Sequence, residues 1–312
     1  MAVTAETVAV TPLSVRGALK AQSPLQDTAR KLVRHRSFRV GATLLLFLVF
    51  VSVFAGLLAP YDPTKPLRTV KRRAVPCIHL LGCPAYQEQH IMGIDGNSRD
   101  LFSRVIYGAR LSLQIGFATT LVAILIGSIL GGLAGYSGGW VDNVIMRTMD
   151  VLLAFPSLLL AIAIVAVLGT GLINALIAIG IVSIPIYARL FRSSVLAIIE
   201  LEYVTAARSI GSSSIRLFLR HILPNALTPI IVAGSLGIAS SILEAAALSF
   251  LGLGAEPPTP EWGLMLGEER NSVFNAPHLV FFPGIAIMIT VLAFNLIGDG
   301  LRDALDPRLR VS

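Results

Sequence analysis

Few residues in this sequence have the types and spacing that catalysis, nucleotide binding or metal binding requires. The chain has no glycine-rich phosphate loop followed by Lys-Ser or Lys-Thr, and no H-E-x-x-H zinc motif. It also has no Ser–His–Asp set that a membrane topology would bring together on one face. We therefore predict that the chain has no catalytic residues, is not an enzyme and carries no cofactor of its own.

The cysteines and histidines would bind a metal only if several of them met on one side of a membrane. Cys77 and Cys83 have only His79 as a further ligand nearby, which leaves a tetrahedral shell incomplete, so we expect no metal site. Outside the reducing cytosol, their spacing is compatible with a local disulfide and also with two free thiols. The histidines divide between the two expected sides, with His35 and His221 inside and His79, His90 and His278 outside.

Glu244 is the one carboxylate inside an apolar run of helical length. Such residues are costly in lipid and are therefore candidates for a functional role. If the helix begins near Ala226, Glu244 lies close to the outer interface, where a structural partner or a hydrated position would also accommodate it. Glu244 is our candidate for lining a membrane pathway, and the structural role is the alternative.

The composition places the chain in a membrane. Of the 312 residues, 54% are hydrophobic and 14% are charged, and the mean hydropathy is +0.77. A buried soluble core does not account for this balance, which is typical of a polytopic membrane protein. The formal net charge of +7 does not indicate nucleic acid, because no aromatic and basic motif for reading bases is present. We predict that the basic residues set the topology and contact anionic membrane lipid.

The N-terminal part is expected to form a cytoplasmic tail and one span. Residues 1–39 are polar and lack the small-residue cleavage site of a signal peptide, whereas residues 40–59 are uncharged. At about 1.5 Å per residue, a helix over this second range just crosses a hydrocarbon core of about 30 Å. Basic residues before the span hold the N-terminus in the cytoplasm, and they are Arg30, Lys31, Arg34, Arg36 and Arg39.

Residues 60–110 are expected to lie outside the cell as a long loop that carries the cysteine pair. Its last part and the start of the next span, residues 90–113, mix glycine, charge and apolar positions, which is typical of an interfacial entry segment. Charged residues in such a segment most often form a solvated cluster, and here they are Asp95, Arg99, Asp100 and Arg104.

Residues 111–298 are expected to hold five further spans. This makes an all-α protein with six transmembrane helices and with both termini in the cytoplasm. Residues 136–148 are interpreted as a short polar loop inside the cell, and residues 299–312 as a cytoplasmic tail. The predicted spans are residues 111–135, two helices within residues 151–188 that turn at residues 169–171, residues 226–250 and residues 280–298.

Glycines and prolines in these spans predict how the helices pack. Small residues at helical spacing let neighbouring helices approach closely. Pro156 and Pro185 are expected to be tolerated kinks, because neighbouring helices can satisfy the freed backbone groups. The small residues of the second span are Gly127, Gly131, Gly132 and Gly135.

Residues 199–225 form a polar interruption that predicts two short amphipathic helices. Gly211 stands where the first helix would end in a left-handed conformation, and Pro224 where the second would end. Helices this short are unstable alone in water, so a partner protein or the membrane surface must cover their apolar faces. The first helix has one face at helical spacing, formed by Tyr203, Ala206, Ala207 and Ile210.

This interruption contains a pattern of two alanines, a glycine and a Leu-Pro pair, at Ala206, Ala207, Gly211, Leu223 and Pro224. The pattern resembles the coupling loop of bacterial ATP-binding-cassette importer permeases. In that family the loop docks into a groove on a cytoplasmic ATPase, which implies that ATP and Mg²⁺ bind to two separate ATPase subunits. The implied docking residues are Glu202, Tyr203, Ala206, Ala207, Ile210, Gly211, Leu223 and Pro224.

A longer pattern, G-x-D-x-x-x-R-D-x-x-S-R-x-x-Y-G-A-R-x-S-L, runs from Gly93 to Leu113. Together with EAAALSFLGLG from Glu244 and PEWGLML from Pro260, it resembles the second permease of dipeptide and oligopeptide importers, which has the type I permease fold. The resemblance implies a subunit of the bacterial inner membrane that imports peptides by alternating access. It also implies a homologous second permease and an extracytoplasmic binding protein as partners. Similar permeases import nickel, glutathione and sugars, and these substrates remain alternatives.

Two other classes of function remain open. A self-sufficient secondary transporter would show related halves with paired carboxylates or interrupted helices, and the sequence has no such features. A membrane scaffold or regulator would not need two short helices joined at Gly211, and its activity would not depend on an ATPase.

Overall fold

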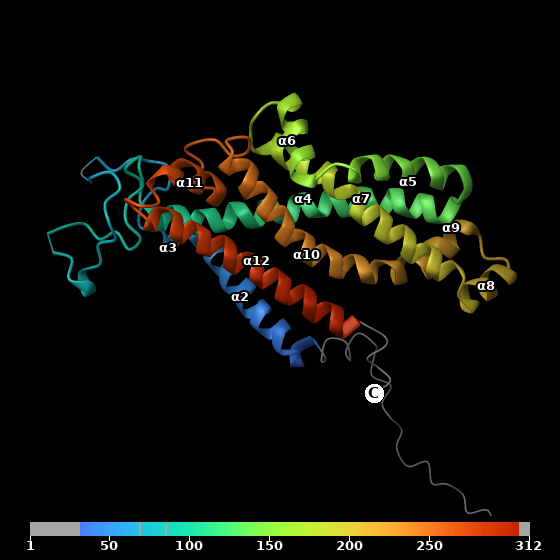
Figure 1. Cartoon of the computed structure of the whole chain (residues 1–312). Helices are drawn as coiled ribbons and strands as arrows, with labels where there is room; N and C mark the ends of the chain where they lie inside the picture. The colour runs from blue at the N-terminus through green and yellow to red at the C-terminus, as the bar shows by residue number, and fades with distance from the viewer. Residues whose placement is uncertain (1–31, 69, 85, 306–312) are drawn as a thin grey trace, which may run out of the picture.

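A computed structural model describes residues 32–68, 70–84 and 86–305 (Figure 1). Over these ranges the fold is helical, and β pairing is limited to two isolated bridges. Five helices are long and apolar enough to cross a membrane, and a bent pair of helices makes six if it counts as one span. Of the predicted tails, residues 1–39 and 299–312, the parts at 1–31 and 306–312 lie outside the described ranges, whereas residues 36–39 and 299–305 are helical and continue the neighbouring spans.

The first span follows the prediction for residues 40–59. It consists of α2 (Arg36–Val53) and, after a break at Phe54, the short α3 (Ala55–Leu58). The remaining α-helices are α4 (Leu101–Ser137), α5 (Gly139–Leu153), α6 (Ser157–Leu168), α7 (Leu172–Ile199), α8 (Glu202–Ser209), α9 (Ser214–Leu217), α10 (Leu223–Phe250), α11 (Trp262–Glu269) and α12 (His278–Leu305). Short 3₁₀ turns lie at His79–Leu81 and Arg270–Ser272.

Helix α4 begins before residue 111, where the sequence placed the end of the outer loop. Asp100 is the N-cap residue, and its carboxylate accepts hydrogen bonds from the backbone N–H and the hydroxyl of Ser103, both at 2.8 Å. Such a cap satisfies a donor that the first helical turn leaves unpaired. The charged residues that follow the cap therefore belong to a helix and not to a loop.

Residues 136–148 do not form the predicted polar loop, because most of them lie in α5. Two ion pairs hold this helix against α7: Arg192 Nε lies 2.5 Å from Asp142 Oδ1, and Arg189 Nη2 lies 2.7 Å from Asp150 Oδ1. Helices α5 and α6 meet at an angle of 93°. Pro156 therefore marks a break between two helices, where the sequence predicted a tolerated kink. The predicted kink position Pro185 does lie inside α7.

The glycines of α4 form a seam against α7, as predicted. A Cβ added at Gly131 would collide with the carbonyl oxygen of Ala188, and one at Gly127 would come within 2.7 Å of Tyr187 Cβ. A Cβ added at Gly135 would lie 3.1 Å from the Arg192 carbonyl oxygen. The two backbones therefore approach more closely than any larger residue on α4 would permit.

The molecule has two distinct ends (Figure 1). Helices α8 and α9 lie at one end, whereas α11 and the long segment between α3 and α4 lie at the other. Helices α2 and α12 run side by side, and His35 Nε2 lies 3.0 Å from Asp303 Oδ2 where α2 begins and α12 ends. The start of α2 and the end of α12 both point away from the segment that precedes α4.

Candidate functional site

The segment Glu202–Asn225, which we call the 202–225 loop, contains the two short helices that the sequence predicts (Figure 1). Between α8 and α9, Gly211 has a φ of +83°, which is left-handed. Glycine adopts this conformation at little cost because it has no Cβ. The predicted glycine stop is confirmed.

The second short helix continues into the next span, so the predicted end at Pro224 is wrong. Residues Phe218–Ile222 form a π-helical turn that joins α9 to α10, and Pro224 lies in the first turn of α10. A π turn is wider than an α turn, which relieves the usual clash between a proline ring and the preceding turn. Asn225 donates its side-chain amide to the His221 carbonyl at 2.7 Å and to the Tyr203 hydroxyl at 3.2 Å.

The inner face of the loop is part of the protein core. Val204 and Ala207 of α8 are buried, and they pack in one cluster with side chains from α4, α7 and α10. The sequence grouped Ala207 with the exposed docking face, but it is only 8% exposed and points inward. Val204 and Ala207 lie on one side of α8, so the two alanines of the motif face in different directions. The other buried members of the cluster are Ala123, Tyr187, Phe191, Val195, Leu217, Ile222, Ala226 and Ile230.

The outer face of the loop is apolar and uncovered. Ile210 is 85% exposed and Ile215 is 74% exposed, the highest values for apolar side chains of this loop. Tyr203 and Ala206 are also exposed. Of the eight residues implied for docking, six are exposed, Leu223 is partly buried and Ala207 is buried. Leu201, directly before the loop, and Leu219 within it are further exposed apolar side chains.

A tyrosine connects the loop to α4. The Tyr136 hydroxyl donates to the Ser214 carbonyl at 3.1 Å, and its ring packs edge-on against Phe218 with 5.4 Å between the centroids. The loop is therefore attached to α4 through Tyr136, to α7 through its buried core and to α10 through the continuous helix.

At the opposite end, a buried ion cluster replaces the solvated cluster that the sequence predicted. Arg99 Nε lies 2.6 Å from Asp95 Oδ2, and Arg99 Nη2 lies 2.8 Å from Glu268 Oε2. Arg104 contacts the same two carboxylates at 3.4 and 3.3 Å. Asp95, Arg99, Asp100 and Arg104 are each at most 4% exposed. Glu268 of α11, which is distant in sequence, supplies the two arginines with the acceptor that water would otherwise provide.

Further hydrogen bonds join this cluster to the segment before α4. The Arg104 guanidinium donates to the carbonyl oxygens of Pro63 and Pro258, each at 3.1 Å. Glu269 accepts from Arg73 Nε at 3.0 Å and from the Gly96 backbone N–H at 2.6 Å. These contacts fasten the described residues 60–68, 70–84 and 86–100, together with α11, to the start of α4. We call them the outer cap, after the side of the membrane that the sequence predicts for them.

Helix α11 is capped by Glu261, a residue that the sequence reasoning did not single out. Its carboxylate accepts from the backbone N–H groups of Gly263 at 3.0 Å and Leu264 at 2.7 Å. Burial raises the pKa of Glu261, while these two hydrogen bonds oppose the shift. The neighbouring Trp262 donates its indole N–H to the Val105 carbonyl at 3.0 Å. The sequence signal for this contact was the group of acidic residues after Pro260, because Glu268 and Glu269 of that group pair with arginines near the start of α4.

Glu244 lies apart from both the 202–225 loop and the buried ion cluster. It is half-buried on α10, close to Ser157 at the start of α6. This position is near the C-terminal end of α10, which the sequence predicts to lie outside the cell. A partner hydroxyl beside it corresponds to the structural alternative, and partial exposure leaves the carboxylate accessible from one side.

The cysteine pair lies in the outer cap. Cys77 and Cys83 are joined as a disulfide, with 5.3 Å between their Cα atoms, a separation typical of disulfides. Within the ranges that the structure describes, no three His, Cys, Asp or Glu side chains gather in a way that could hold a metal ion.

Comparison with known proteins identifies the family. Residues 104–311 match binding-protein-dependent transport system inner membrane components, and residues 23–76 match the N-terminal transmembrane domain of oligopeptide transport permease C. A dipeptide transport system permease protein of Alkalihalophilus pseudofirmus is 48% identical over 292 residues, which is 93% of this chain and 92% of the relative. A glutathione transport system permease protein of Pectobacterium atrosepticum is 44% identical over 289 residues, covering 93% of each chain.

The solved structures support the fold. An inward-facing form of the MetNI methionine ABC transporter superposes with a TM-score of 0.55 at 17% identity, covering 65% of this chain and 97% of the other. At this identity the likeness concerns the type I permease fold alone. Together with the apolar helices, the matches show that the chain belongs to the binding-protein-dependent transport system inner membrane components, as a multi-pass permease subunit of an ABC importer resembling the dipeptide permeases.

Proposed function

We propose that this chain is the second permease of an ATP-driven importer of dipeptides or oligopeptides. The observation that carries the proposal is the two-sided 202–225 loop. Its outer face presents Ile210 and Ile215 without a cover, while its inner face is packed against α4, α7 and α10. An exposed apolar patch on a rigid support is what a docking site for a partner protein requires.

In this proposal the loop docks on one of two ATPase subunits, which bind ATP and Mg²⁺. Closure of the ATPases moves α8 and α9, and the attachments through Tyr136 and the buried core carry that movement into the spans. The pathway is shared with a homologous second permease and alternates between inward-facing and outward-facing states. Glu244 lines this pathway near its outer end, and an extracytoplasmic binding protein delivers the substrate.

The topology of the proposal has six spans with both termini in the cytoplasm. Arginines concentrate at the loop end, which fits the rule that basic residues stay in the cytoplasm. The start of α2 and the end of α12 point away from the outer cap, and His35 and Asp303 bring them together. The basic residues of the loop end are Arg189, Arg192, Arg208, Arg216 and Arg220.

The test is co-purification of the chain with ATPases encoded beside its gene. Ala206→Arg places a long charged side chain on the exposed docking face, and we expect it to abolish ATPase capture. Thr205→Arg is the matched control, because Thr205 is also exposed on α8 but lies about 100° further around the helix. We expect Thr205→Arg to capture the ATPase as the wild type does. Ala207→Arg should instead lower the amount of folded protein, since Ala207 is buried.

Equal ATPase capture by the wild type, Ala206→Arg and Thr205→Arg would contradict the docking face. Capture of no ATPase by the wild type would contradict the coupling role. A glutathione importer is the second candidate, because curated relatives that are 44% and 46% identical carry that name. The reconstituted complex distinguishes the two: uptake of a labelled dipeptide that excess glutathione does not reduce supports the peptide substrate.

A further inference from the structure

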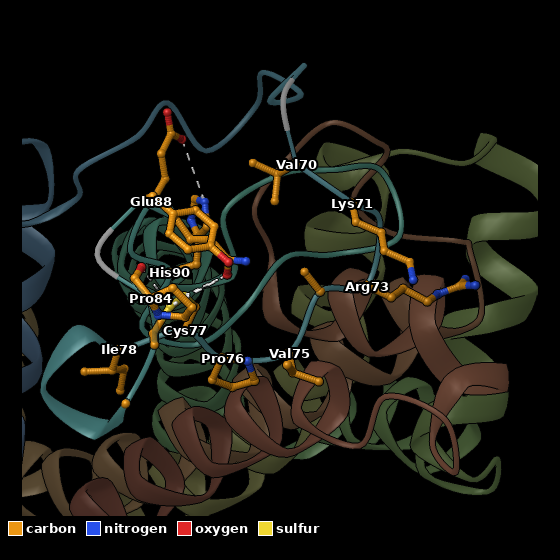
Figure 2. Close-up of a pocket in the computed structure, with 15 residues that line it drawn as sticks. Val70, Lys71, Arg73, Val75, Pro76, Cys77, Ile78, Pro84, Glu88 and His90 are labelled. Atoms are coloured by element: carbon orange, nitrogen blue, oxygen red, sulfur yellow. Dashed lines mark hydrogen bonds and ion pairs between the residues drawn. A yellow bond between two sulfur atoms is a disulfide. The ribbon is translucent and has the colours of Figure 1, made fainter.

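The two ends of the molecule are held by different kinds of contact. In the outer cap, the Cys77–Cys83 disulfide and two backbone hydrogen bonds of 2.9 Å between Cys77 and His90 fix the chain around a hollow (Figure 2). In the 202–225 loop, three polar groups from α8, the π turn and α10 meet through hydrogen bonds alone. A single hydrogen bond contributes little net stability, whereas a disulfide opens only by reaction with a thiol. The contacts of the loop are therefore the ones that can open and close while the protein works.

The π turn before α10 is short of one backbone donor. The Leu223 N–H closes the turn on the Phe218 carbonyl, but the next residue, Pro224, has no N–H. One carbonyl in this turn therefore lacks the donor that any other residue at position 224 would supply. Backbone groups without a backbone partner are usually satisfied by side chains or water. We therefore expect side-chain donors near the π turn to contribute to its stability.

Tyr203, His221 and Asn225 supply such donors as a closed triad. Asn225, at the start of α10, donates its amide to the His221 carbonyl of the π turn at 2.7 Å and to the Tyr203 hydroxyl at 3.2 Å. The Tyr203 hydroxyl, on α8, donates to the same carbonyl at 3.4 Å. A carbonyl only accepts, so the nitrogen of the Asn225 amide has to face it. The triad thus joins α8 to the point where α10 begins.

Tyr203 is also part of the exposed docking face. It is 43% exposed, and Ala206 and Ile210 are exposed beside it. Positions 203, 206 and 210 share one face of a helix, so a protein seated on Ala206 and Ile210 also lies against the Tyr203 ring. The Tyr203 hydroxyl makes the longest of the three hydrogen bonds in the triad. Contact with a partner at the ring therefore acts directly on the weakest bond of the triad.

From this arrangement we infer that Tyr203 and Asn225 are positioning residues for ATP coupling. Tyr203 contacts the docked ATPase, and Asn225 links the position of Tyr203 to the start of α10. The coupling role rests on the proposed function, because it needs an ATPase at the loop. The stabilisation of the π turn by the triad is a property of the chain alone.

The first measurement is hydrogen exchange in the full chain in lipid nanodiscs, followed by mass spectrometry of fragments that cover residues 218–225. Tyr203→Phe removes only the hydroxyl, and Asn225→Asp replaces the donating amide nitrogen with an oxygen that only accepts. Each variant should speed exchange of the Leu223 N–H about two- to tenfold, the range expected for the loss of one hydrogen bond. Thr205→Val is the matched control, because Thr205 is exposed on α8 and its hydroxyl lies outside the triad. Its exchange should equal that of the wild type.

The second measurement is the number of ATP molecules hydrolysed per peptide imported by the reconstituted importer. Asn225→Asp leaves the docking face intact and should capture the ATPase as the wild type does, yet both triad variants should hydrolyse more ATP per peptide. Unchanged exchange in both variants would overturn the triad, as would an equal effect of Thr205→Val.

An unchanged ratio of ATP to peptide in variants with faster exchange would overturn the coupling role and leave the proposed function standing. Capture of no ATPase by the wild type would overturn the coupling role together with the proposed function. The exchange result would still decide whether the triad stabilises the π turn.

Discussion

Replacing Arg104 with methionine should be among the most damaging single changes in the outer cap. The Arg104 side chain is fully buried, lies 3.4 Å from Asp95 and 3.3 Å from Glu268, and donates to two carbonyl oxygens at 3.1 Å. Methionine retains the apolar stem but leaves these acceptors without a donor. Breaking a buried ion pair from one side typically costs about 3–5 kcal/mol. Arg99 continues to neutralise both carboxylates, so we expect a loss near the lower value.

The assay is the free energy of unfolding in detergent micelles, measured for the wild type, Arg104→Met and the control Arg110→Met. Arg110 lies on the same helix but is exposed, so its loss should cost no more than about 0.5 kcal/mol. Glu268→Gln combined with Arg104→Met should cost less than the two single changes added together, because the pair interacts directly. Equal stability of Arg104→Met and Arg110→Met would refute the reasoning, since it would mean that the cost of desolvating Arg104 offsets all of its ion pairs and hydrogen bonds.

Three further outcomes are expected. Gly131→Ala should lower the free energy of unfolding by about 1–3 kcal/mol, because its Cβ meets the Ala188 carbonyl. Gly284→Ala is the control and should not be destabilising, since Gly284 has open space around it. Denaturation of both variants checks this, and equal effects would contradict a tight seam between α4 and α7. The raised pKa of Glu261 means that the folded state holds this proton more tightly than the unfolded state, so the stability of the wild type relative to Glu261→Gln should fall as pH rises from the unfolded pKa of about 4.3 through the higher folded one. A pH-independent difference would show that burial does not penalise the Glu261 carboxylate. Alkylation without reductant, followed by mass spectrometry, should leave Cys77 and Cys83 unlabelled, and labelling of both would exclude the disulfide.

The residue pattern was sufficient to predict those elements whose conformation depends mainly on residues near them in the sequence. A glycine with open space around it at position 211, the glycines of α4 and the uncharged runs each predict their structure from a few neighbouring residues. The second short helix was predicted to end at Pro224 because a proline usually stops a helix, and the π turn before it was not visible in the residue pattern. The outward direction of Ala206 and the inward direction of Ala207 likewise follow from tertiary packing against α7.

The outer cap was the part that sequence reasoning could not assemble. Arg99 and Glu268 are separated by 169 positions, and nothing local to either residue names the other. Solvation was therefore the expected state for the arginines, and burial became favourable only because α11 supplies carboxylates at hydrogen-bonding distance. Helix α5 escaped prediction for a related reason, since Asp142 and Asp150 are polar on their own but are paired with arginines of α7 in the fold.

The π-helical turn at Phe218–Ile222 allows a change in helical register between α9 and α10. A π turn contains one residue more than the α turn it replaces, and such turns are frequent at functional positions. Converting it to an α turn would rotate α9 by about 100° relative to α10, and would shift it by about 1.5 Å along the axis. A movement of the loop would then be divided, because this one turn lets α9 rotate relative to α10, while Tyr136 and the buried core carry the displacement into α4 and α7.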